Sequence, residues 1–369
     1  MPCRRKTCAA APVLGLALAA CAPRAEPVAP AGTAPVVAVP VTFAPTPAQA
    51  GAPAAPAEPT PAPGGAATVD AVAVASAELA VRTVEARRAL EAFVRAHPDD
   101  PQTTPDALLR LALLTDDPAR ELPLLETFAA RFADHPRRST VELERARVHA
   151  LLGDERAAAH ALGLLTCLER AAPAVGGTER LRPLPGCAPL PGASDEERGR
   201  ALWQLGEAAF EAGALDAASD AYRRALAALP PASAVRPVAG YKLAWSESRA
   251  GRFLPALEAV SRLLTDGAGA LRAEALELGA MGVAEPDWTG DDRPDPVVGV
   301  RRPELAAWLA RTDAWLPELL EVAGRFLAEA QELAAAVECF ELVLARHAGY
   351  AHADRVRGAL AEARRRLRP

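Results

Sequence analysis

The sequence has 369 residues, of which 50% are hydrophobic, 24% are charged and 4% are aromatic, and its formal net charge is −6. This length is sufficient for a sizeable buried core or for a chain of stacked units. The mildly acidic balance argues against nucleic acid as the main partner, because nucleic-acid binding relies on basic surfaces.

The first twenty residues have the organisation of an export signal. Arg4, Arg5 and Lys6 precede an apolar segment from Ala9 to Ala20, which is too short to span a bilayer as a mature helix. We therefore expect residues 1–20 to be a signal peptide that is removed. Loss of its three positive charges would change the formal net charge from −6 to −9.

The end of this apolar run, Leu18-Ala19-Ala20-Cys21, resembles the lipobox of bacterial lipoproteins. In that motif the cysteine becomes the acylated first residue of the mature chain, so the resemblance implies that Cys21 carries acyl groups such as palmitate. Several acyl chains hold a protein on a membrane stably, whereas one does not. Ala22 after the cysteine favours, by the same resemblance, the periplasmic face of the outer membrane. An ordinary signal cleaved after Ala20 and a single buried anchor are the alternatives.

Residues 22–67 consist almost wholly of Pro, Ala, Val, Thr and Gly, with nearly no charge and no periodic apolar face. Such a segment cannot build a core. We expect residues 21–67 to be the lipidated cysteine and a disordered tether that, at roughly 3.1 Å per residue, extends on the order of 100 Å. A low-complexity segment without a selected role would behave in the same way.

Residues 68–369 are dominated by alanine, leucine and arginine, and Lys242 is their sole lysine. These compositions favour helix, whereas Val and Ile are too sparse for a sheet. Glycines at 153, 213 and 251 separate apolar stretches of about fourteen residues, a pattern typical of helical hairpins. We predict an all-α fold with about twelve to fourteen helices.

Helix-start signals agree with this prediction. Ser139 and Glu142, like Ser194 and Glu197, have the spacing of a capping box, in which each side chain accepts a hydrogen bond from the backbone N–H of the other residue. Thr104 before Pro105 is typical of a cap followed by proline at the first helical position.

One segment, Gly199 to about Pro231, has small and large residues at the positions of a tetratricopeptide repeat. The inward stripe, turn and second-helix positions are Leu202, Leu205, Gly206, Ala209, Gly213, Ala218, Tyr222, Ala225 and Pro230. Gly206 and Ala218 permit close approach of two helices, and Tyr222 fills the space beside them. On these residues the segment resembles the tetratricopeptide repeat family, although Leu202 and Ala209 replace its usual aromatic residues.

Weaker copies occur at matching intervals. They contain Leu243, Ala244, Ala256 and Ala268 around Gly251, then Gly324, Ala336 and Phe340 with Gln331 at the turn, and Gly153 with Ala158. Degenerate units are typical of folds in which stacking supplies the stability. The resemblance therefore implies a right-handed solenoid of stacked helical hairpins over residues 68–369.

Two insertions interrupt the expected solenoid. The first, 171–193, is rich in Pro and Gly and is bracketed by Cys167 and Cys187. In an exported chain these cysteines either form a disulfide, or Cys167 remains a buried thiol of the preceding apolar helix. We expect Cys339 to be buried and free. The spacing of the cysteines predicts no metal site.

The second insertion, 282–302, contains four aspartates at 287, 291, 292 and 295. Carboxylates are calcium ligands, but their spacing misses the alternating ligands of a helix-loop-helix calcium site, and the intervening prolines favour a solvated loop. Trp288 is expected to pin this loop onto neighbouring helices, and Trp308 and Trp315 are expected in the core of the next pair.

The sequence shows no convergent catalytic constellation. Its histidines are scattered, and no G-x-S-x-G, P-loop or dinucleotide-binding glycine motif occurs in a strand-turn-helix setting. We therefore predict that the protein is not an enzyme, has no cofactor and uses no small-molecule substrate.

The candidate partner-binding residues are those that the repeat resemblance places on the inner side of the solenoid. They are Arg200, Trp203, Glu207 and Phe210 in one unit and Tyr241, Trp245 and Arg249 in the next. Aromatic residues and arginine concentrate binding free energy. The alternative, that Trp203 and Trp245 fill the seam between adjacent units, is equally compatible with the sequence.

In overall plan the chain resembles tetratricopeptide lipoproteins of bacterial envelopes, including those of outer-membrane assembly, cell-wall coordination and myxobacterial gliding. We predict a lipid-anchored periplasmic adaptor that binds an envelope protein or peptide, with the acidic insertion and the tether favouring the gliding type. A purely structural subunit of an outer-membrane assembly and an accessory factor of a cell-wall enzyme are the alternatives.

Overall fold

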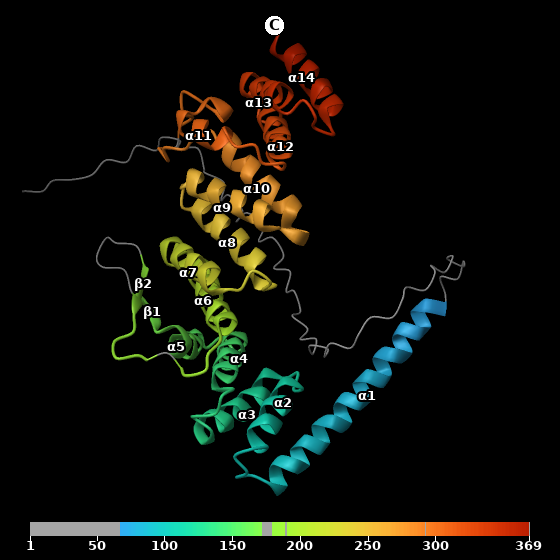
Figure 1. Ribbon diagram of the computed structural model, residues 1–369, viewed down its shortest axis with the longest axis vertical. Coiled ribbons are helices and arrows are strands. Elements are labelled where there is room, and N and C mark those ends of the chain that lie inside the picture. Colours follow the sequence, from blue (N-terminus) through green and yellow to red (C-terminus); the bar gives the residue numbers. More distant parts are fainter. Residues whose placement is uncertain (1–66, 172–178, 189, 292, 369) are drawn as a thin grey trace, which may run out of the picture. The chain divides into compact units, whose positions relative to one another are not determined.

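The computed structural model describes residues 67–369 except 172–178, 189, 292 and 369, and it describes side chains from residue 81 onward (Figure 1). The predicted signal peptide, the lipidation at Cys21 and the tether therefore lie outside the described residues. Within the described part the chain forms fourteen α-helices, three short 3-10 helices and one pair of strands. This agrees with the all-α prediction.

Neighbouring helices pair as hairpins. The pairs are α2 (Thr104–Leu113) with α3 (Pro118–Arg131), α4 (Arg138–Leu151) with α5 (Glu155–Thr166), α6 (Asp195–Glu211) with α7 (Leu215–Ala228), α8 (Val235–Arg249) with α9 (Phe253–Asp266), and α12 (Leu316–Glu329) with α13 (Leu333–Arg346). The first helix of a hairpin also contacts the first helix of the next, as α4 contacts α6 and α6 contacts α8. The described helices thus form a tetratricopeptide-like stack, as the sequence predicts.

Two helices flank the hairpins. The thirty-residue helix α1 (Ala67–Ala96) packs on α2, and α14 (Ala353–Leu367) packs on α13 and α12. In α14 the residues Val356, Leu360 and Ala363 are buried, while its other face is charged and exposed. A polar outer face is what a terminal helix of a stacked array requires. No helix in the described residues combines the length and the apolar character needed to cross a membrane.

Left-handed residues close the hairpins. Gly153, Gly213 and Gly251 have φ values of 77°, 74° and 70°, and Gln331 adopts the same conformation with φ of 68°. Glycine has no Cβ to clash in this region, so it ends a helix and reverses the chain at little cost. The turns predicted at these four positions are confirmed.

In two hairpins a glycine on the first helix faces an aromatic ring sixteen residues later on the second helix. The pairs are Gly206 with Tyr222 and Gly324 with Phe340, and all four residues are buried. The absence of a side chain on each glycine leaves room for the ring, which keeps the interior close-packed.

The buried residues form two clusters that meet at α4. Val141 and Val148 of α4 belong to the cluster around α2 and α3, whereas Leu143 and Ala146 belong to the larger cluster that continues to α14. Trp308 and Trp315 are 2% and 4% exposed, so their predicted place in the core is confirmed.

The capping predictions had different outcomes. The capping box of Ser194 and Glu197 is present at the start of α6. The box predicted at Ser139 is wrong, because α4 begins at Arg138 and Glu142 instead pairs with arginines of its own helix. Thr104 is not the cap of α2 either, since its hydroxyl donates to the carbonyl of His97 and Thr103 occupies the cap position.

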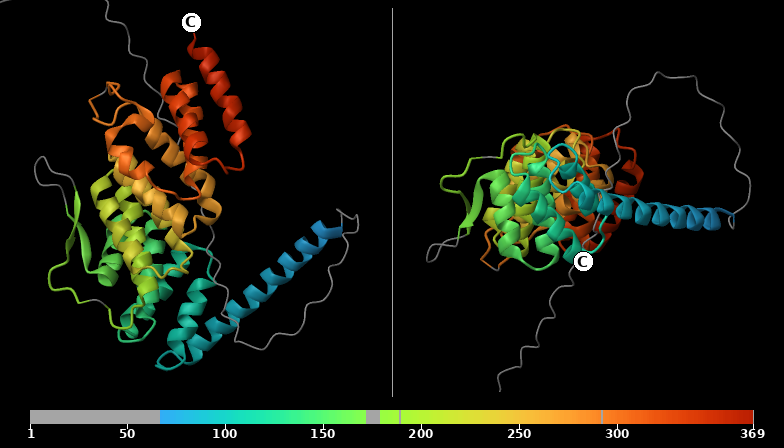
Figure 2. Two further views of the ribbon diagram at one scale, coloured as in Figure 1. Left: turned by 45° about the horizontal axis from the view of Figure 1, so that its top comes forward. Right: turned by 90° about the horizontal axis from the view of Figure 1, so that it is seen from below.

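A β-hairpin that the sequence analysis did not anticipate begins at Leu168, ahead of the predicted start of the first insertion at residue 171. Strand β1 (Leu168–Ala171) pairs antiparallel with β2 (Arg180–Pro183), with Leu168 opposite Pro183, and the strands contact α5 and α7 (Figure 2). Cys167 has a left-handed backbone and forms a disulfide with Cys187 across the base of this hairpin. Strands of four residues that mix charged and apolar side chains carry too little alternation to be recognised from sequence.

The second insertion starts later than predicted. Helix α10 (Arg272–Ala284) continues through Gly282 and Val283, which are buried, so the loop begins at Glu285. It leads through the 3-10 helices η2 (Gly299–Arg301) and η3 (Pro303–Leu305) into the four-residue helix α11 (Ala306–Leu309). The unit that begins with α10 therefore lacks a full-length second helix.

Candidate functional site

The seven predicted partner-binding residues lie on two adjacent first helices. Arg200, Trp203, Glu207 and Phe210 are on α6, and Tyr241, Trp245 and Arg249 are on α8. The two helices contact each other, and α8 also contacts α10. We call the surface carried by these residues, together with Lys242, Glu274, Glu277 and Met281, the α6–α10 face.

Glu207 joins three helices. Its Oε1 accepts a hydrogen bond of 2.6 Å from the hydroxyl of Tyr222 on α7, and its Oε2 lies 2.8 Å from Nζ of Lys242 on α8. Burial raises the pKa of Tyr222, and the charge of Glu207 raises it further, so this hydroxyl stays protonated as a donor. Glu207 thus has a structural role that the sequence analysis did not assign to it.

Phe210 is flanked by two cations. Nζ of Lys242 lies 5.2 Å from the centroid of its ring, and the guanidinium carbon of Arg249 lies 4.9 Å from it. Such contacts between a cation and an aromatic ring are attractive within about 6 Å. Arg249 is exposed and forms no ion pair with any residue that the structure describes. Its charge is therefore available to a partner.

Tyr241 and Trp245 lie partly buried against the main core. Burial raises the pKa of Tyr241, a hydrogen bond with Trp245 lowers it, and the negative charges of Glu274 and Glu277 on α10 raise it. Both carboxylates are exposed on α10, the helix that contacts α8.

Arg200 and Trp203 are held at the start of α6. Nε of Arg200 lies 2.6 Å from Glu196, which also accepts a 3.0 Å hydrogen bond from Ser233 just before α8. Trp203 packs partly into the core, and its buried indole N–H has no acceptor among the described residues. The partial burial of Trp203 and Trp245 is consistent with a role in filling the seam between adjacent units. The surface that they leave exposed is consistent with a role in binding a partner.

Lys242 is a member of this face that sequence reasoning missed. It is the sole lysine of residues 68–369 and lies between Glu207 and Phe210. The sequence feature that could have identified it is that a single lysine occurs in this arginine-rich part of the chain. Arginine bears a planar fork, whereas the compact lysine ammonium fits beside one carboxylate oxygen and one ring.

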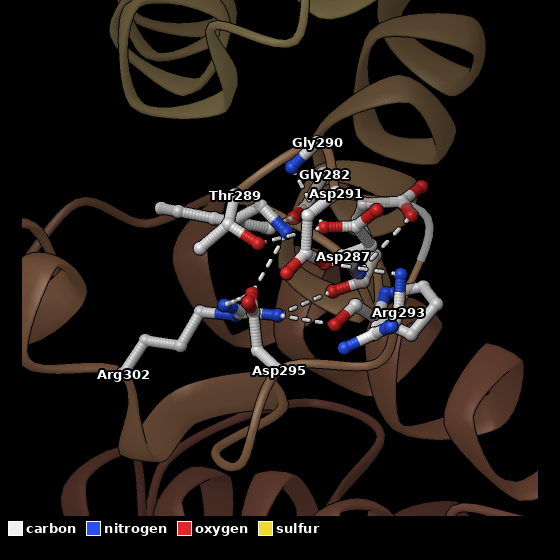
Figure 3. Close-up of polar contacts among 11 residues, drawn as sticks. Gly282, Asp287, Thr289, Gly290, Asp291, Arg293, Asp295 and Arg302 are labelled. Atoms are coloured by element: carbon white, nitrogen blue, oxygen red, sulfur yellow. Dashed lines mark hydrogen bonds and ion pairs between the residues drawn. The ribbon is translucent and has the colours of Figure 1, made fainter.

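The loop of the second insertion is organised around a buried arginine (Figure 3). Arg302 is 5% exposed, pairs with Asp295, and donates to the carbonyl oxygens of Glu285 and Pro286 at 2.7 and 3.1 Å. Its guanidinium carbon lies 4.8 Å from the ring centroid of Trp288. A single cation thus holds both ends of the loop.

Trp288 attaches this loop to the helices, as the sequence analysis expected. Its ring stacks on Phe253 of α9 with centroids 5.6 Å apart, and its indole nitrogen donates to the carbonyl of Gly282 at 3.0 Å. Its backbone N–H donates to Asp295 at 2.7 Å. The ring is therefore fixed between α9, α10 and Arg302.

The aspartates of the loop are engaged by donors of the protein. Asp287 accepts from the backbone N–H of Gly290 at 2.7 Å and from the hydroxyl of Thr289 at 3.0 Å, and Asp291 accepts from the N–H of Arg293 at 3.1 Å. Among the described residues, no group of three or more His, Cys, Asp or Glu side chains is arranged to hold a metal ion. Asp292 lies outside the described residues.

Cys339 is the free cysteine within the described part of the chain, and it is fully buried. Burial raises the pKa of its thiol to about 12. A nucleophilic cysteine needs a thiolate near neutral pH, so this thiol is a core residue rather than a reactive group.

Comparison with known proteins gives structural similarity only. The chain matches no protein-family model, and no curated protein matches its sequence. Among solved structures it is similar to the C-terminal part of a TPR repeat-containing protein from Cytophaga hutchinsonii, with 14% identity and a TM-score of 0.43, covering 74% of this chain and 94% of that one. It is also similar to the TPR domain of P58(IPK), with 13% identity and a TM-score of 0.22, covering 82% and 98%.

Proposed function

We propose that this protein is an adaptor that binds another protein or peptide through the α6–α10 face. The observation that carries this proposal is Arg249, an exposed cation stacked on the ring of Phe210 without a carboxylate partner in the described residues. Arginine and aromatic side chains contribute most of the binding free energy in many interfaces, because they bury large areas and make directional contacts.

The charged residues of the α6–α10 face indicate which charges a complementary partner would carry. Tyr241 and Trp245 precede Arg249 along α8, and the negative charges of Glu274 and Glu277 on α10 act on Tyr241. Met281 on α10 adds an apolar side chain that is 42% exposed. A segment with apolar side chains in its middle and an acidic group toward Arg249 would complement these residues.

We further propose that the adaptor is attached to lipid through Cys21. Its folded part would then lie in the periplasm at the outer membrane. The lipobox-like Leu18-Ala19-Ala20-Cys21 supports attachment. The disulfide between Cys167 and Cys187 supports export, because disulfides persist in oxidising compartments. Participation in a gliding or another envelope complex is a further proposal that rests on the overall plan of the chain.

Site-specific photo-crosslinking in cells tests the adaptor proposal. A photoreactive residue at Met281 is expected to give a discrete crosslinked product, whereas the same residue at Arg262, exposed on α9, is expected to give none. Trp245→Ala with Arg249→Ala should abolish the product. Equal crosslinking at both positions, or a product that survives the double substitution, would contradict the proposal.

Metabolic labelling with an alkynyl fatty acid tests the anchor. Label should appear on the wild-type chain and be absent from Cys21→Ser, with Cys339→Ser as the matched control that keeps it. Label retained on Cys21→Ser would rule out acylation at this cysteine, without bearing on the adaptor surface.

A further inference from the structure

The row of second helices is interrupted between α9 and α13. The second helices α5, α7, α9 and α13 have twelve to fourteen residues, whereas α11 has four. Arg311, just after α11, pairs with Glu258 of α9 at 2.8 Å, and Arg346 of α13 donates to the carbonyl of Leu309 in α11 at 3.1 Å. The short helix therefore occupies the place of a second helix but fills only part of it.

An open cleft lies beside this short helix. It has a volume of about 430 Å³ and lies between η2 and α11 on one side and α13 on the other; we call it the α11–α13 cleft. Its apolar lining comes from Val300, Leu309, Leu342 and Ala345, of which Leu309 is buried and the others are partly or fully exposed. Apolar side chains that a neighbouring helix would cover thus face solvent here.

The charges on the rim of the cleft leave one cation without a counter-charge. Arg301 pairs with Glu338, and Glu341 pairs with Arg364 of α14 at 2.6 Å. Arg346 bonds only the carbonyl of Leu309 and has no carboxylate partner among the described residues. An apolar floor beside an uncompensated guanidinium favours a ligand that combines apolar groups with a carboxylate.

We propose that the α11–α13 cleft binds a helical segment of a partner protein, which presents two apolar side chains one turn apart and a glutamate or aspartate one turn further on. The apolar pair packs on Val300 and Leu342, and the carboxylate pairs with Arg346. The segment thereby continues the interrupted row of second helices, as an amphipathic helix does when it lies in an apolar groove. This site shares no residue with the α6–α10 face.

A set of three synthetic helices tests the proposal with the full chain. The fluorescent peptides are about sixteen residues long, since shorter helices are marginal in water. They share an alanine- and glutamine-rich sequence with leucine at positions i and i+4, and differ only in carrying Glu, Gln or Lys at i+7. Fluorescence anisotropy should show the Glu peptide binding about tenfold more tightly than the Lys peptide.

Matched variants locate the binding. Arg346→Ala should remove the preference for the Glu peptide, whereas Arg325→Ala, an exposed arginine on α12, should leave it intact. Ala345→Phe, which fills the cleft at an exposed position, should weaken all three peptides. Trp245→Ala with Arg249→Ala should change nothing, which separates this site from the α6–α10 face.

Three results would overturn the proposal. The first is the absence of binding for all three peptides at millimolar concentration, and the second is equal affinity for the Glu and Lys peptides on the wild-type chain. Binding that Ala345→Phe leaves unchanged would place the peptides elsewhere and would equally reject this cleft as their site.

Discussion

Gly206 of α6 lies so close to Tyr222 of α7 that a Cβ atom added to the glycine would come within 2.5 Å of Cε1 of the tyrosine ring. The ring cannot move aside easily, because it is fully buried and its hydroxyl is bonded to Glu207. Gly324 stands in the same relationship to Phe340, with a corresponding distance of 2.6 Å. In these two hairpins the paired helices can therefore approach each other closely only because the first helix has glycine at this position.

Gly206→Ala is predicted to lower the free energy of unfolding by about 1–3 kcal/mol, the usual cost of overpacking a core. Urea unfolding followed by circular dichroism measures this change. Gly358→Ala in α14 is the control, since nothing lies within 4 Å of its added Cβ. There alanine should stabilise by about 0.5–1 kcal/mol because it favours helix. Equal destabilisation by both substitutions would contradict the packing explanation.

Reduction of the disulfide between Cys167 and Cys187 is predicted to destabilise the fold. The two cysteines are 20 residues apart, and a crosslink over such a loop contributes about 3 kcal/mol in the chain-entropy account. Thermal unfolding with and without reductant measures the loss. The double variant Cys167→Ser and Cys187→Ser should match the reduced wild type and be insensitive to reductant; a variant as stable as the oxidised protein would refute this prediction.

The thiol of Cys339 should resist alkylation in the folded protein. Burial raises its pKa to about 12, so almost no thiolate is present near neutral pH. Mass spectrometry of the peptide that contains Cys339, after exposure of native and urea-unfolded protein to iodoacetamide, measures the difference. Similar alkylation rates in the two states would show that this side chain is accessible.

Glu321 is predicted to make the attachment of α14 sensitive to acid. Burial opposes its ionisation, but hydrogen bonds from Arg355 and Tyr350 of the last segment outweigh this and place its pKa below the ordinary value of 4.5. A carboxyl with a lowered folded pKa contributes stability that is present above the unfolded pKa and is lost as the pH falls through the folded one. Stability should therefore decline below pH 4.5, and Glu321→Gln should weaken this decline.

The pKa of Glu121 is shifted in the opposite direction to that of Glu321. Burial raises its pKa above the ordinary value, although Arg147 partly opposes this, so its contribution to stability improves as the pH falls toward 4.5. Glu121→Gln should therefore make the acid side of the stability profile steeper, where Glu321→Gln makes it shallower. Denaturant midpoints measured at several pH values distinguish the two, and changes of the same sign would contradict the assignment.

Arg302→Ala is predicted to release the loop of the second insertion. Removing Arg302 leaves Asp295 without its cation and the carbonyl oxygens of Glu285 and Pro286 without their donor. The expected results are proteolytic cleavage between Trp288 and Val298 and a shift of tryptophan fluorescence. Arg293→Ala, on the exposed part of the same loop, is the control and should leave the cleavage pattern unchanged. A protease-resistant loop in Arg302→Ala would show that Trp288 alone is sufficient to hold it.

The helical hairpins could be predicted because their signals are local. Gly153, Gly213 and Gly251 mark positions where the backbone must be left-handed, and the conformational preference of glycine belongs to that residue alone. The sequence also indicated a close helix contact at Gly206, but it paired this glycine with Ala218, whereas the structure places the ring of Tyr222 against it. The seven candidate residues came from the resemblance to the tetratricopeptide repeat, and in the structure they lie on the adjacent helices α6 and α8.

The tertiary structure decided what depends on distant partners. Whether Ser139 caps a helix depends on where α4 begins, and Lys242 joined the face because Glu207 and Phe210 of another helix surround it. The truncated second helix at α11 and the cleft beside it arise only when α9, α11 and α13 come together. Composition and turn chemistry determine which segments are helical, but the surfaces that stay uncovered are set by long-range packing, to which residues adjacent in sequence contribute little.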